Sequence, residues 1–320
     1  TDACLNDCTA ASCGDQHIQA GIEDCDDGNQ VQTDACLNSC VAASCGDSHV
    51  QAGVEACDDG NQVDDDSCDN NCQRNLSTTT LGLGWYVNCL LRSGVPYCMG
   101  RNSEGGVGDG TTTNRNTPTQ VSGLTGVTQL AVRHKGACAL KANATVWCWG
   151  DNNYGQIGDG TTTHRSTPVQ VSGMTNAVEI SAGIYSTCAR RSDGTVWCWG
   201  YNNYGELGDG TNNNRQTPVQ VSGLTNVVQI DMGAYHHCAR KGDGSSWCWG
   251  RNSEGALGDG STTQRTTPVR VNNDSGIVEL RAAAHHTCGR KNNGTVWCWG
   301  RNANGSLGDG TTTNRTGPVQ

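Results

Sequence analysis

Cysteine and histidine are the residues of this 320-residue chain with the greatest capacity for chemistry, and it contains 20 and eight of them. Together they could bind a metal, but zinc–thiolate sites are usually built on CxxC pairs, and the sequence contains none. An even number of cysteines in a repeating pattern is typical of a disulfide framework, which persists in an oxidising compartment. We therefore predict an exported protein, located outside the cell or at its surface.

The distribution of charge excludes one class of partner. Residues 1–76 contain 16 acidic residues and one Arg, whereas residues 77–320 contain 15 acidic and 20 basic residues. The first segment would repel the phosphate backbone, and the second is only weakly basic, so we expect no nucleic-acid partner. No apolar run in the sequence is long enough to cross a bilayer, which predicts no transmembrane segment. The 44 Gly and the lack of Phe argue against a helical protein.

Residues 1–76 form a cysteine-rich segment with an internal repeat. Its two full copies align without gaps: SCGDQHIQAGIEDCDDGNQVQTDACLNSC begins at Ser12, and SCGDSHVQAGVEACDDGNQVDDDSCDNNC begins at Ser44. We assign units to residues 12–43 and 44–75, with half a unit at residues 1–11. A unit this short cannot bury enough apolar surface to be stable, so its four cysteines must form disulfides, in a pairing that the sequence leaves open.

The half unit has two interpretations. Its Cys4 and Cys8 correspond to Cys36 and Cys40 of the following unit. Either Cys4 and Cys8 pair with each other, or the chain is cut from a longer array; we favour the second. The units resemble short cysteine-rich repeats with a CDDGN core found in secreted and surface proteins of myxobacteria and related organisms, and this resemblance implies a location rather than an activity.

Each unit also repeats a group of acidic and amide side chains that could bind calcium. Ca²⁺ takes about six to eight oxygen ligands, and carboxylates clustered beside a Gly that turns the chain can supply them. The alternative is that DDGN forms a turn in which Asp and Asn accept hydrogen bonds from their own backbone. The candidate Ca²⁺ ligands are Glu23, Asp26, Asp27, Asn29, Asp34, Glu55, Asp58, Asp59, Asn61 and Asp66.

Residues 77–320 contain five copies of a second unit, of about 50 residues. In the third copy we expect four strands, at VEISAG, STCARR, TVWCWG and PVQV. Four short strands per unit, joined by Gly-rich loops, are typical of a β-propeller blade. An Asp and an Arg recur in register, and we expect the Asp to cap backbone groups of its loop and the Arg to pair nearby. These residues are Asp109, Asp159, Asp209, Asp259 and Asp309, with Arg115, Arg165, Arg215, Arg265 and Arg315.

The pattern WCWG-x-N-x-x-G-x-L/I-G-D-G…P-V-Q-V, followed by AG-x-x-x-x-C-A, resembles RCC1-type repeats in their bacterial form. The resemblance covers residues 77–320 and implies an all-β fold, a β-propeller with blades at about 77–125, 126–175, 176–225, 226–275 and 276–320. RCC1 propellers usually have seven blades, and five are visible here. We expect that the ring closes with fewer blades, or that other protein, such as a second copy joined head to tail, completes it.

Cysteine and tryptophan alternate in the third strand of four blades, and the first blade carries an altered copy, VPYCMG, at residues 95–100. Successive side chains of a strand point to opposite faces, so Trp147 and Trp149 would face one neighbouring blade and Cys148 the other. Three-residue loops that end in Gly would place Cys188 opposite Cys198 as a non-hydrogen-bonded pair, with Cα atoms about 4.5 Å apart. We predict the disulfides Cys89–Cys98, Cys138–Cys148, Cys188–Cys198, Cys238–Cys248 and Cys288–Cys298.

No catalytic set is evident, because the sequence contains neither a nucleophile elbow nor a phosphate-binding loop, and we predict a protein that is not an enzyme. His236, His237, His285 and His286 precede blade cysteines and could bind a metal, but we favour a structural role. Glycosylation could occur at the sequons Asn75, Asn143, Asn273, Asn293, Asn304 and Asn314.

Two functions fit these observations. The first is a structural or adhesive surface protein, in which cysteine-rich and calcium-bound units join disulfide-stapled propellers into an extracellular assembly or fibre. The second is an extracellular ligand-binding module, such as a lectin-like propeller that uses its loop face, with Tyr154, Tyr201 and Tyr204 as candidate contact residues. We favour the first, because disulfides recur in every blade and no catalytic set accompanies them.

Overall fold

The computed structural model describes residues 80–320 without interruption and, before them, residues 18, 24–26, 28–31, 36–39, 41–42, 44 and 47–50. The chain divides into two compact units, Thr1–Thr78 and Thr79–Gln320. In the described part of the first unit, a disulfide joins Cys25 to Cys36, and Cys36 forms an isolated β-bridge with Ala42. This disulfide pairs the second and third cysteines of the repeat unit at residues 12–43.

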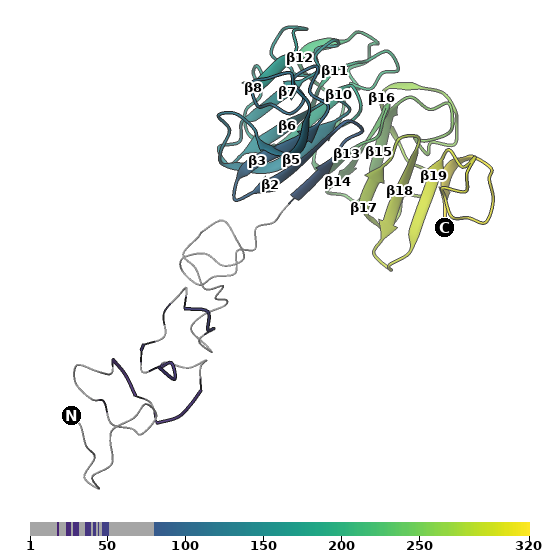
Figure 1. The fold of residues 1–320 in the computed structure, drawn as a ribbon. Coiled ribbons are helices and arrows are strands. Elements are labelled where there is room, and N and C mark those ends of the chain that lie inside the picture. The colour runs from purple at the N-terminus through teal and green to yellow at the C-terminus, as the bar shows by residue number, and fades with distance from the viewer. Residues whose placement is uncertain are drawn as a thin grey trace, which may run out of the picture. The chain divides into compact units, whose positions relative to one another are not determined.

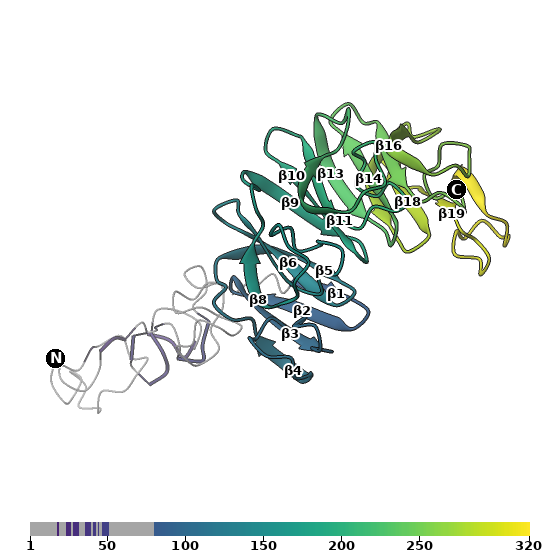
Figure 2. The same cartoon turned by 90° about the horizontal axis from the view of Figure 1, so that it is seen from above.

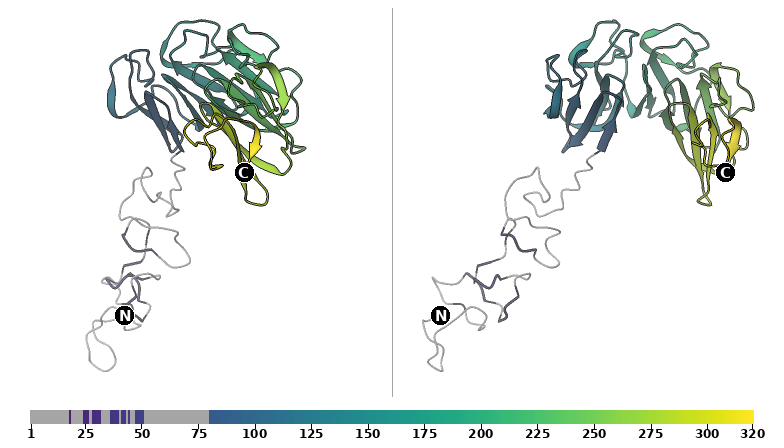
Figure 3. Two further views of the ribbon diagram at one scale, coloured as in Figure 1. Left: turned by 90° about the vertical axis from the view of Figure 1, so that its right-hand side faces the viewer. Right: turned by 45° about the vertical axis from the view of Figure 1, so that its right-hand side comes forward.

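The second unit is an all-β propeller arc, as predicted. It consists of five antiparallel sheets of four strands each, paired in chain order, which we number blades 1 to 5. No helix that could cross a membrane occurs among the described residues. Figures 1 and 2 show the blades following one another around an arc, with blades 1 and 5 at its ends, and Figure 3 shows the same order from two further sides.

The strands of all five blades have similar lengths and spacing. Blade 1 contains β1 (Thr80–Leu83), β2 (Val87–Arg92), β3 (Val95–Gly100) and β4 (Arg115–Gln120); blade 2 contains β5 (Val127–Arg133), β6 (Gly136–Lys141), β7 (Val146–Gly150) and β8 (Arg165–Gln170). Blade 3 contains β9 (Ala177–Ala182), β10 (Ser186–Arg191), β11 (Val196–Gly200) and β12 (Arg215–Gln220). Blade 4 contains β13 (Val227–Met232), β14 (His236–Lys241), β15 (Ser246–Gly250) and β16 (Arg265–Arg270); blade 5 contains β17 (Ile277–Ala282), β18 (His286–Lys291), β19 (Val296–Gly300) and β20 (Arg315–Val319).

The blade disulfides lie where the strand register places them. Cys188 of β10 is opposite Cys198 of β11, and their Cα atoms are 4.1 Å apart, slightly closer than expected. The hairpin loop closes with a hydrogen bond from the amide of Gly194 to the carbonyl of Arg191, and Gly194 has a positive φ of 76°, a conformation that favours glycine. The five bonds are Cys89–Cys98, Cys138–Cys148, Cys188–Cys198, Cys238–Cys248 and Cys288–Cys298, the predicted pairs.

The alternation of Cys and Trp packs each blade onto its neighbours. Trp149 of blade 2 is fully buried in one apolar cluster with Cys89 and Cys98 of blade 1. Cys148 faces the other way, into a cluster with Trp199 of blade 3. Each buried Trp also donates its indole N–H to a carbonyl of the preceding blade: Trp149 to Gly106 (3.0 Å), Trp199 to Gln156 (3.0 Å), Trp249 to Glu206 (2.7 Å) and Trp299 to Ala256 (2.9 Å).

A buried asparagine organises the long loop between the third and fourth strands. In blade 3, Asn202 Nδ2 donates to the carbonyl of Thr211 (3.1 Å), and Asn202 Oδ1 accepts from the amide of Leu207 (2.8 Å). Asp209 accepts from the amide of Thr211 (2.9 Å) and pairs with Arg215 (Nε–Oδ2 2.9 Å), which is the predicted structural network. The asparagine is fully buried in every blade, as Asn102, Asn152, Asn202, Asn252 and Asn302.

The end blades expose side chains that the inner blades bury. Val296 of blade 5 is 52% exposed, whereas Val146 and Val196 at the same position are fully buried. In blade 1, Leu81 and Leu83 of β1 are 63% and 76% exposed. The described arc therefore presents apolar surface at both of its ends.

Candidate ligand-binding face

Six of the seven tyrosines of the chain lie at one edge of the blades, where two loops of each blade meet. In blade 3 the amide of Tyr201, directly after β11, donates to the carbonyl of Tyr185, directly before β10 (3.0 Å). The same bond joins Arg251 to Tyr235 in blade 4 (2.9 Å). We define the tyrosine face as Tyr86, His134, Tyr154, Tyr185, Tyr201, Tyr204 and Tyr235.

The rings of the tyrosine face form an unbroken series of contacts across four blades. Ring centroids are 4.8 Å apart for Tyr86–His134, 5.6 Å for His134–Tyr185, 5.3 Å for Tyr185–Tyr154, 5.0 Å for Tyr154–Tyr201, 6.4 Å for Tyr201–Tyr235 and 5.7 Å for Tyr235–Tyr204. These distances and the edge-on geometry are those of favourable aromatic pairs. Most of these side chains are half-buried. Part of each ring therefore packs against its neighbours, and the exposed part can contact a ligand.

Residue types on this face differ between blades. The position of Tyr201 is occupied elsewhere by Arg101, Asp151, Arg251 and Arg301, and the position of Tyr204 by Glu104, Tyr154, Glu254 and Asn304. By contrast, the fully buried asparagine is the same in all five blades. A blade therefore folds with several residue types at the face positions, and the fold does not require tyrosine there.

Two arginines flank the rings. The guanidinium of Arg101 lies 5.4 Å from the ring centre of Tyr86. That of Arg251 lies 5.7 Å from the ring centre of Tyr204 and 5.9 Å from that of Tyr235. Cation–π attraction of this kind holds an arginine side chain in place while leaving N–H donors for a ligand.

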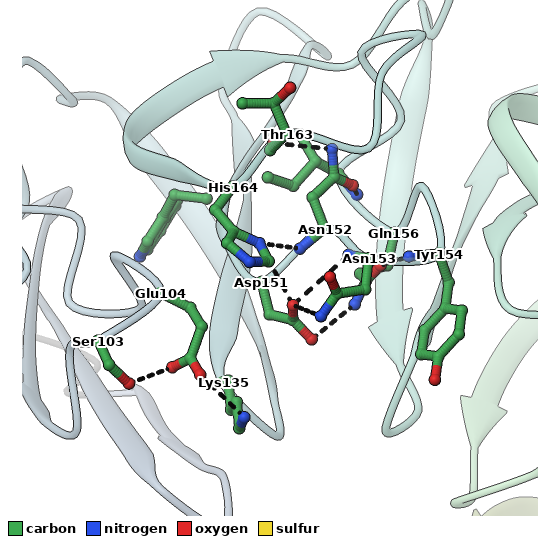
Figure 4. Close-up of polar contacts among 12 residues, drawn as sticks. Ser103, Glu104, Lys135, Asp151, Asn152, Asn153, Tyr154, Gln156, Thr163 and His164 are labelled. Carbon is green, nitrogen blue, oxygen red and sulfur yellow. Dashed lines mark hydrogen bonds and ion pairs between the residues drawn. The ribbon is translucent and has the colours of Figure 1, made fainter.

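Buried polar side chains fix the backbone beneath the rings. In blade 2, shown in Figure 4, Gln156 accepts from the amide of Tyr154 (2.8 Å) and donates to Asp151 (3.0 Å). Glu206 takes the place of Gln156 in blade 3: one carboxyl oxygen accepts from the amide of Tyr204 (2.8 Å), and the other has no hydrogen-bond partner among the described residues. Burial raises the pKa of Glu206 to about 7.

A cavity of about 260 Å³ adjoins the tyrosine face. It is lined by the segments that follow the first strands of all five blades and includes Trp85 and His134, whose rings are 5.6 Å apart. Small-molecule sites usually have volumes of about 300–1,000 Å³. The cavity is smaller than that range, so we place the candidate contact surface on the rings.

The structure brings together the three tyrosines that the sequence singled out. Tyr154 and Tyr204 contact Tyr201 at ring distances of 5.0 and 6.2 Å. The sequence did not indicate the roles of Tyr185 and Tyr235, although both occupy the residue directly before the second strand of a blade. That shared position is the signal that could have identified them.

The structure separates the histidines His236 and His237. They are neighbours on β14, so their side chains point to opposite faces: His237 Nε2 is 2.9 Å from the hydroxyl of Ser186 in blade 3, and His236 Nε2 is 2.8 Å from that of Thr287 in blade 5. Burial lowers the pKa of both imidazoles to about 3. Both side chains therefore serve as neutral hydrogen-bonding groups between blades.

The remaining metal candidates in the propeller also lack a suitable arrangement. His237 lies close to Cys188 and Cys198, but these two sulfur atoms are bonded to each other and are not thiolate ligands. His285 and His286 are half-buried, and burial lowers the pKa of both. The described structure thus does not gather the four predicted histidines into one site.

Of the candidate calcium ligands, only Asp26 and Asn29 are described. Asp26 accepts a hydrogen bond from the amide of Gly28 (2.8 Å), and Asn29 accepts one from the amide of Val31 (2.6 Å). These are the self-bonded turns of the alternative interpretation. Glu23, Asp27, Asp34, Glu55, Asp58, Asp59, Asn61 and Asp66 lie outside the described residues, as does the sequon Asn75. The other sequon residues, Asn143, Asn273, Asn293, Asn304 and Asn314, are exposed.

Comparison with solved structures shows the same fold in RCC1 proteins. The chain superposes on yeast RCC1 (Prp20), solved bound to Kap60, with a TM-score of 0.68 and 21% identity, covering 75% of this chain and 60% of that one. It superposes on human WBSCR16 with a TM-score of 0.67 and 22% identity, covering 75% and 65% of the two chains. It superposes on Prp20p from Saccharomyces cerevisiae with a TM-score of 0.67 and 22% identity, covering 75% of this chain and 62% of that one. The chain thus spans less than two thirds of the length of each of these proteins.

Sequence comparison gives the family. No curated protein is significantly similar to the chain in sequence. The family described as "RCC1-like domain" matches residues 9–320, a range that begins inside the segment assigned above to cysteine-rich repeats. Since this match extends over nearly the whole chain, the protein belongs to the RCC1-like domain family.

Proposed function

We propose that this protein is an extracellular binding module whose tyrosine face contacts a ligand. The observation that carries the proposal is the continuous series of ring contacts across four blades, at positions where the fold tolerates other residues. Tyrosines with a packed edge and an accessible hydroxyl supply large contact area at low entropic cost, which is why they are frequent at recognition surfaces. The assignment is to binding, with no chemical step.

The extracellular location is supported by the cysteines. Six disulfides occur among the described residues, and five of them staple the middle hairpins of the blades. Such bonds persist in oxidising environments and are rare in a reducing cytosol.

The test is an array that carries both oligosaccharides and peptides, probed with the disulfide-bonded chain. Tyr201→Ala and Tyr235→Ala should each reduce binding to the recognised ligands by about tenfold or more, because the Tyr201 ring contacts four other rings of the series and the Tyr235 ring contacts two. The control is Tyr97→Ala, which removes the one tyrosine that lies off the face, in β3. Binding that is equal in all three variants would refute the proposal.

A structural or adhesive role is a second candidate, favoured by the complementary Cys and Trp sides of the blades. Each inner junction joins the Cys side of one blade to the Trp side of the next, and Val296 on the Cys side of blade 5 is exposed. A second copy of the chain could cover that face, head to tail. Light scattering should then show association that Val296→Asp abolishes, and a chelator would weaken it if calcium braces the cysteine-rich units. A monomer at all concentrations would count against assembly.

A further inference from the structure

Blade 4 departs from the other blades at one residue of its long loop. In blades 1, 3 and 5 the backbone N–H of the buried asparagine donates to the side-chain oxygen of another asparagine. The pairs are Asn102 to Asn114, Asn202 to Asn214 and Asn302 to Asn314, each at 2.8 Å. In blade 2, His164 accepts the same bond from Asn152 (3.0 Å), as Figure 4 shows. Blade 4 carries Gln264 there, and in this fully described blade it makes no such bond to the amide of Asn252.

A cavity lies where this hydrogen bond is absent. A hollow of about 320 Å³ is lined by Tyr204, Arg251, Asn252, Ser253, Thr262 and Gln264. Glutamine has one more methylene than asparagine, so from the same backbone position its amide cannot cap the Asn252 N–H in the same way. This volume falls at the lower end of the range of small-molecule sites, and it lies between blades 3 and 4 beside the tyrosine face.

The cavity holds a positioned arginine whose charge is neutralised. Arg251 Nε donates to Ser253 (3.0 Å) and Nη2 to Glu254 (3.2 Å), while the guanidinium lies over the ring of Tyr204. A guanidinium has five N–H donors, so three remain after these two bonds. Because Glu254 balances the charge, the site favours a neutral ligand over an anion.

We propose that this cavity is a subsite for a neutral saccharide unit. Tyr204 lines the cavity, and the C–H groups of a pyranose can pack against an aromatic ring. Arg251 and the Asn252 amide supply donors, while Thr262 and Gln264 supply both donors and acceptors for ring hydroxyls. The proposal rests on the proposed binding function and names its ligand class. The size of the cavity suits one sugar ring, such as the end unit of a longer glycan.

The decisive variant is Gln264→Asn, which gives blade 4 the capping residue of blades 1, 3 and 5. It should cap the Asn252 backbone N–H and withdraw that donor from the cavity while keeping or raising the thermal stability, because it restores a hydrogen bond that three other blades already make. The matched control is Gln170→Asn, the same change at an exposed residue of β8. Tyr204→Ala is the second test variant, since it removes the packing surface without altering the loop.

Binding is measured by saturation-transfer NMR and by titration with the methyl glycosides of glucose, galactose, mannose and N-acetylglucosamine, with N-acetylneuraminic acid as the anionic comparison. At least one neutral glycoside should bind the unmodified chain, and its Kd should rise about tenfold or more in Gln264→Asn and Tyr204→Ala but not in Gln170→Asn. The subsite is overturned if no neutral glycoside binds, if binding survives Gln264→Asn, or if the acidic sugar binds best. Peptide binding that depends on Tyr201, without saccharide binding, would retain the proposed function and remove only the subsite.

Discussion

The interior of the blades and the tyrosine face follow opposite rules. In the interior, Trp149, Trp199, Trp249 and Trp299 are all fully buried and all donate to the preceding blade. On the face, the residue two positions after that Trp is Asp151, Tyr201, Arg251 or Arg301. Repetition thus marks the contacts that the fold requires, and variation marks the surface that is free to acquire a specific partner.

The largest effect on the free energy of unfolding should come from a substitution in the interior of the blades. Trp199→Ala would leave a large cavity against the Cys138–Cys148 disulfide and remove an inter-blade hydrogen bond. We expect a loss of about 3–5 kcal/mol in the free energy of unfolding, measured by urea titration of the oxidised chain. A loss below about 1 kcal/mol would remove the distinction between interior and face.

Removing a blade disulfide should have the second-largest effect on the free energy of unfolding. Replacing both Cys188 and Cys198 by Ala removes a bond that closes a short loop, with a sequence separation of 10. The loss should be about 3 kcal/mol if the bond acts by restricting the unfolded chain. The comparison is the double replacement of Cys89 and Cys98, at a separation of 9, which should cost a similar amount; a much smaller cost there would show that blade 1 contributes little to the cooperative unit.

Glu206 lies between the two regions and should make stability depend on pH. Its folded-state pKa, about 7, is above the usual value of 4.5, so ionisation favours the unfolded chain and stability falls as pH rises from about 4.5 to 7. Glu206→Gln, which copies Gln156 of blade 2, should therefore be more stable than the parent by about 2–3 kcal/mol at pH 8 and nearly equal at pH 4.5. A difference that does not change with pH would show that Glu206 is already neutral or well solvated.

The smallest effect on stability is expected on the face itself. Tyr201→Ala removes half-buried ring contacts and should cost about 1 kcal/mol or less in thermal unfolding. The same variant should have a large effect on ligand binding. If Tyr201→Ala destabilises the protein as much as Trp199→Ala does, the tyrosines are a structural element and the comparison fails.

Much of the fold was predictable because its determinants recur. The spacing of Cys188 and Cys198, and the alternation with Trp197 and Trp199, specify a hairpin, a disulfide and two packed faces within one unit. The recurring Asp and Arg likewise indicated the loop network.

The site was predictable only in part, because its contacts cross between units. Tyr154 of blade 2 meets Tyr201 of blade 3 through the relative orientation of two sheets, which no local pattern encodes. The cavity beside Gln264 accompanies one extra methylene in a side chain, and its significance is visible only once the bonds that Asn114 and Asn214 accept are known.

The bond from each buried Trp to the blade before it has a consequence for how such chains change over evolutionary time. One repeat of about 50 residues carries both halves of the junction, an indole N–H for its predecessor and a carbonyl for its successor. A gene duplication or deletion of one whole repeat therefore regenerates a complete junction at the seam without any compensating substitution. The number of blades can drift by recombination, while the face residues of each new copy are free to diverge independently.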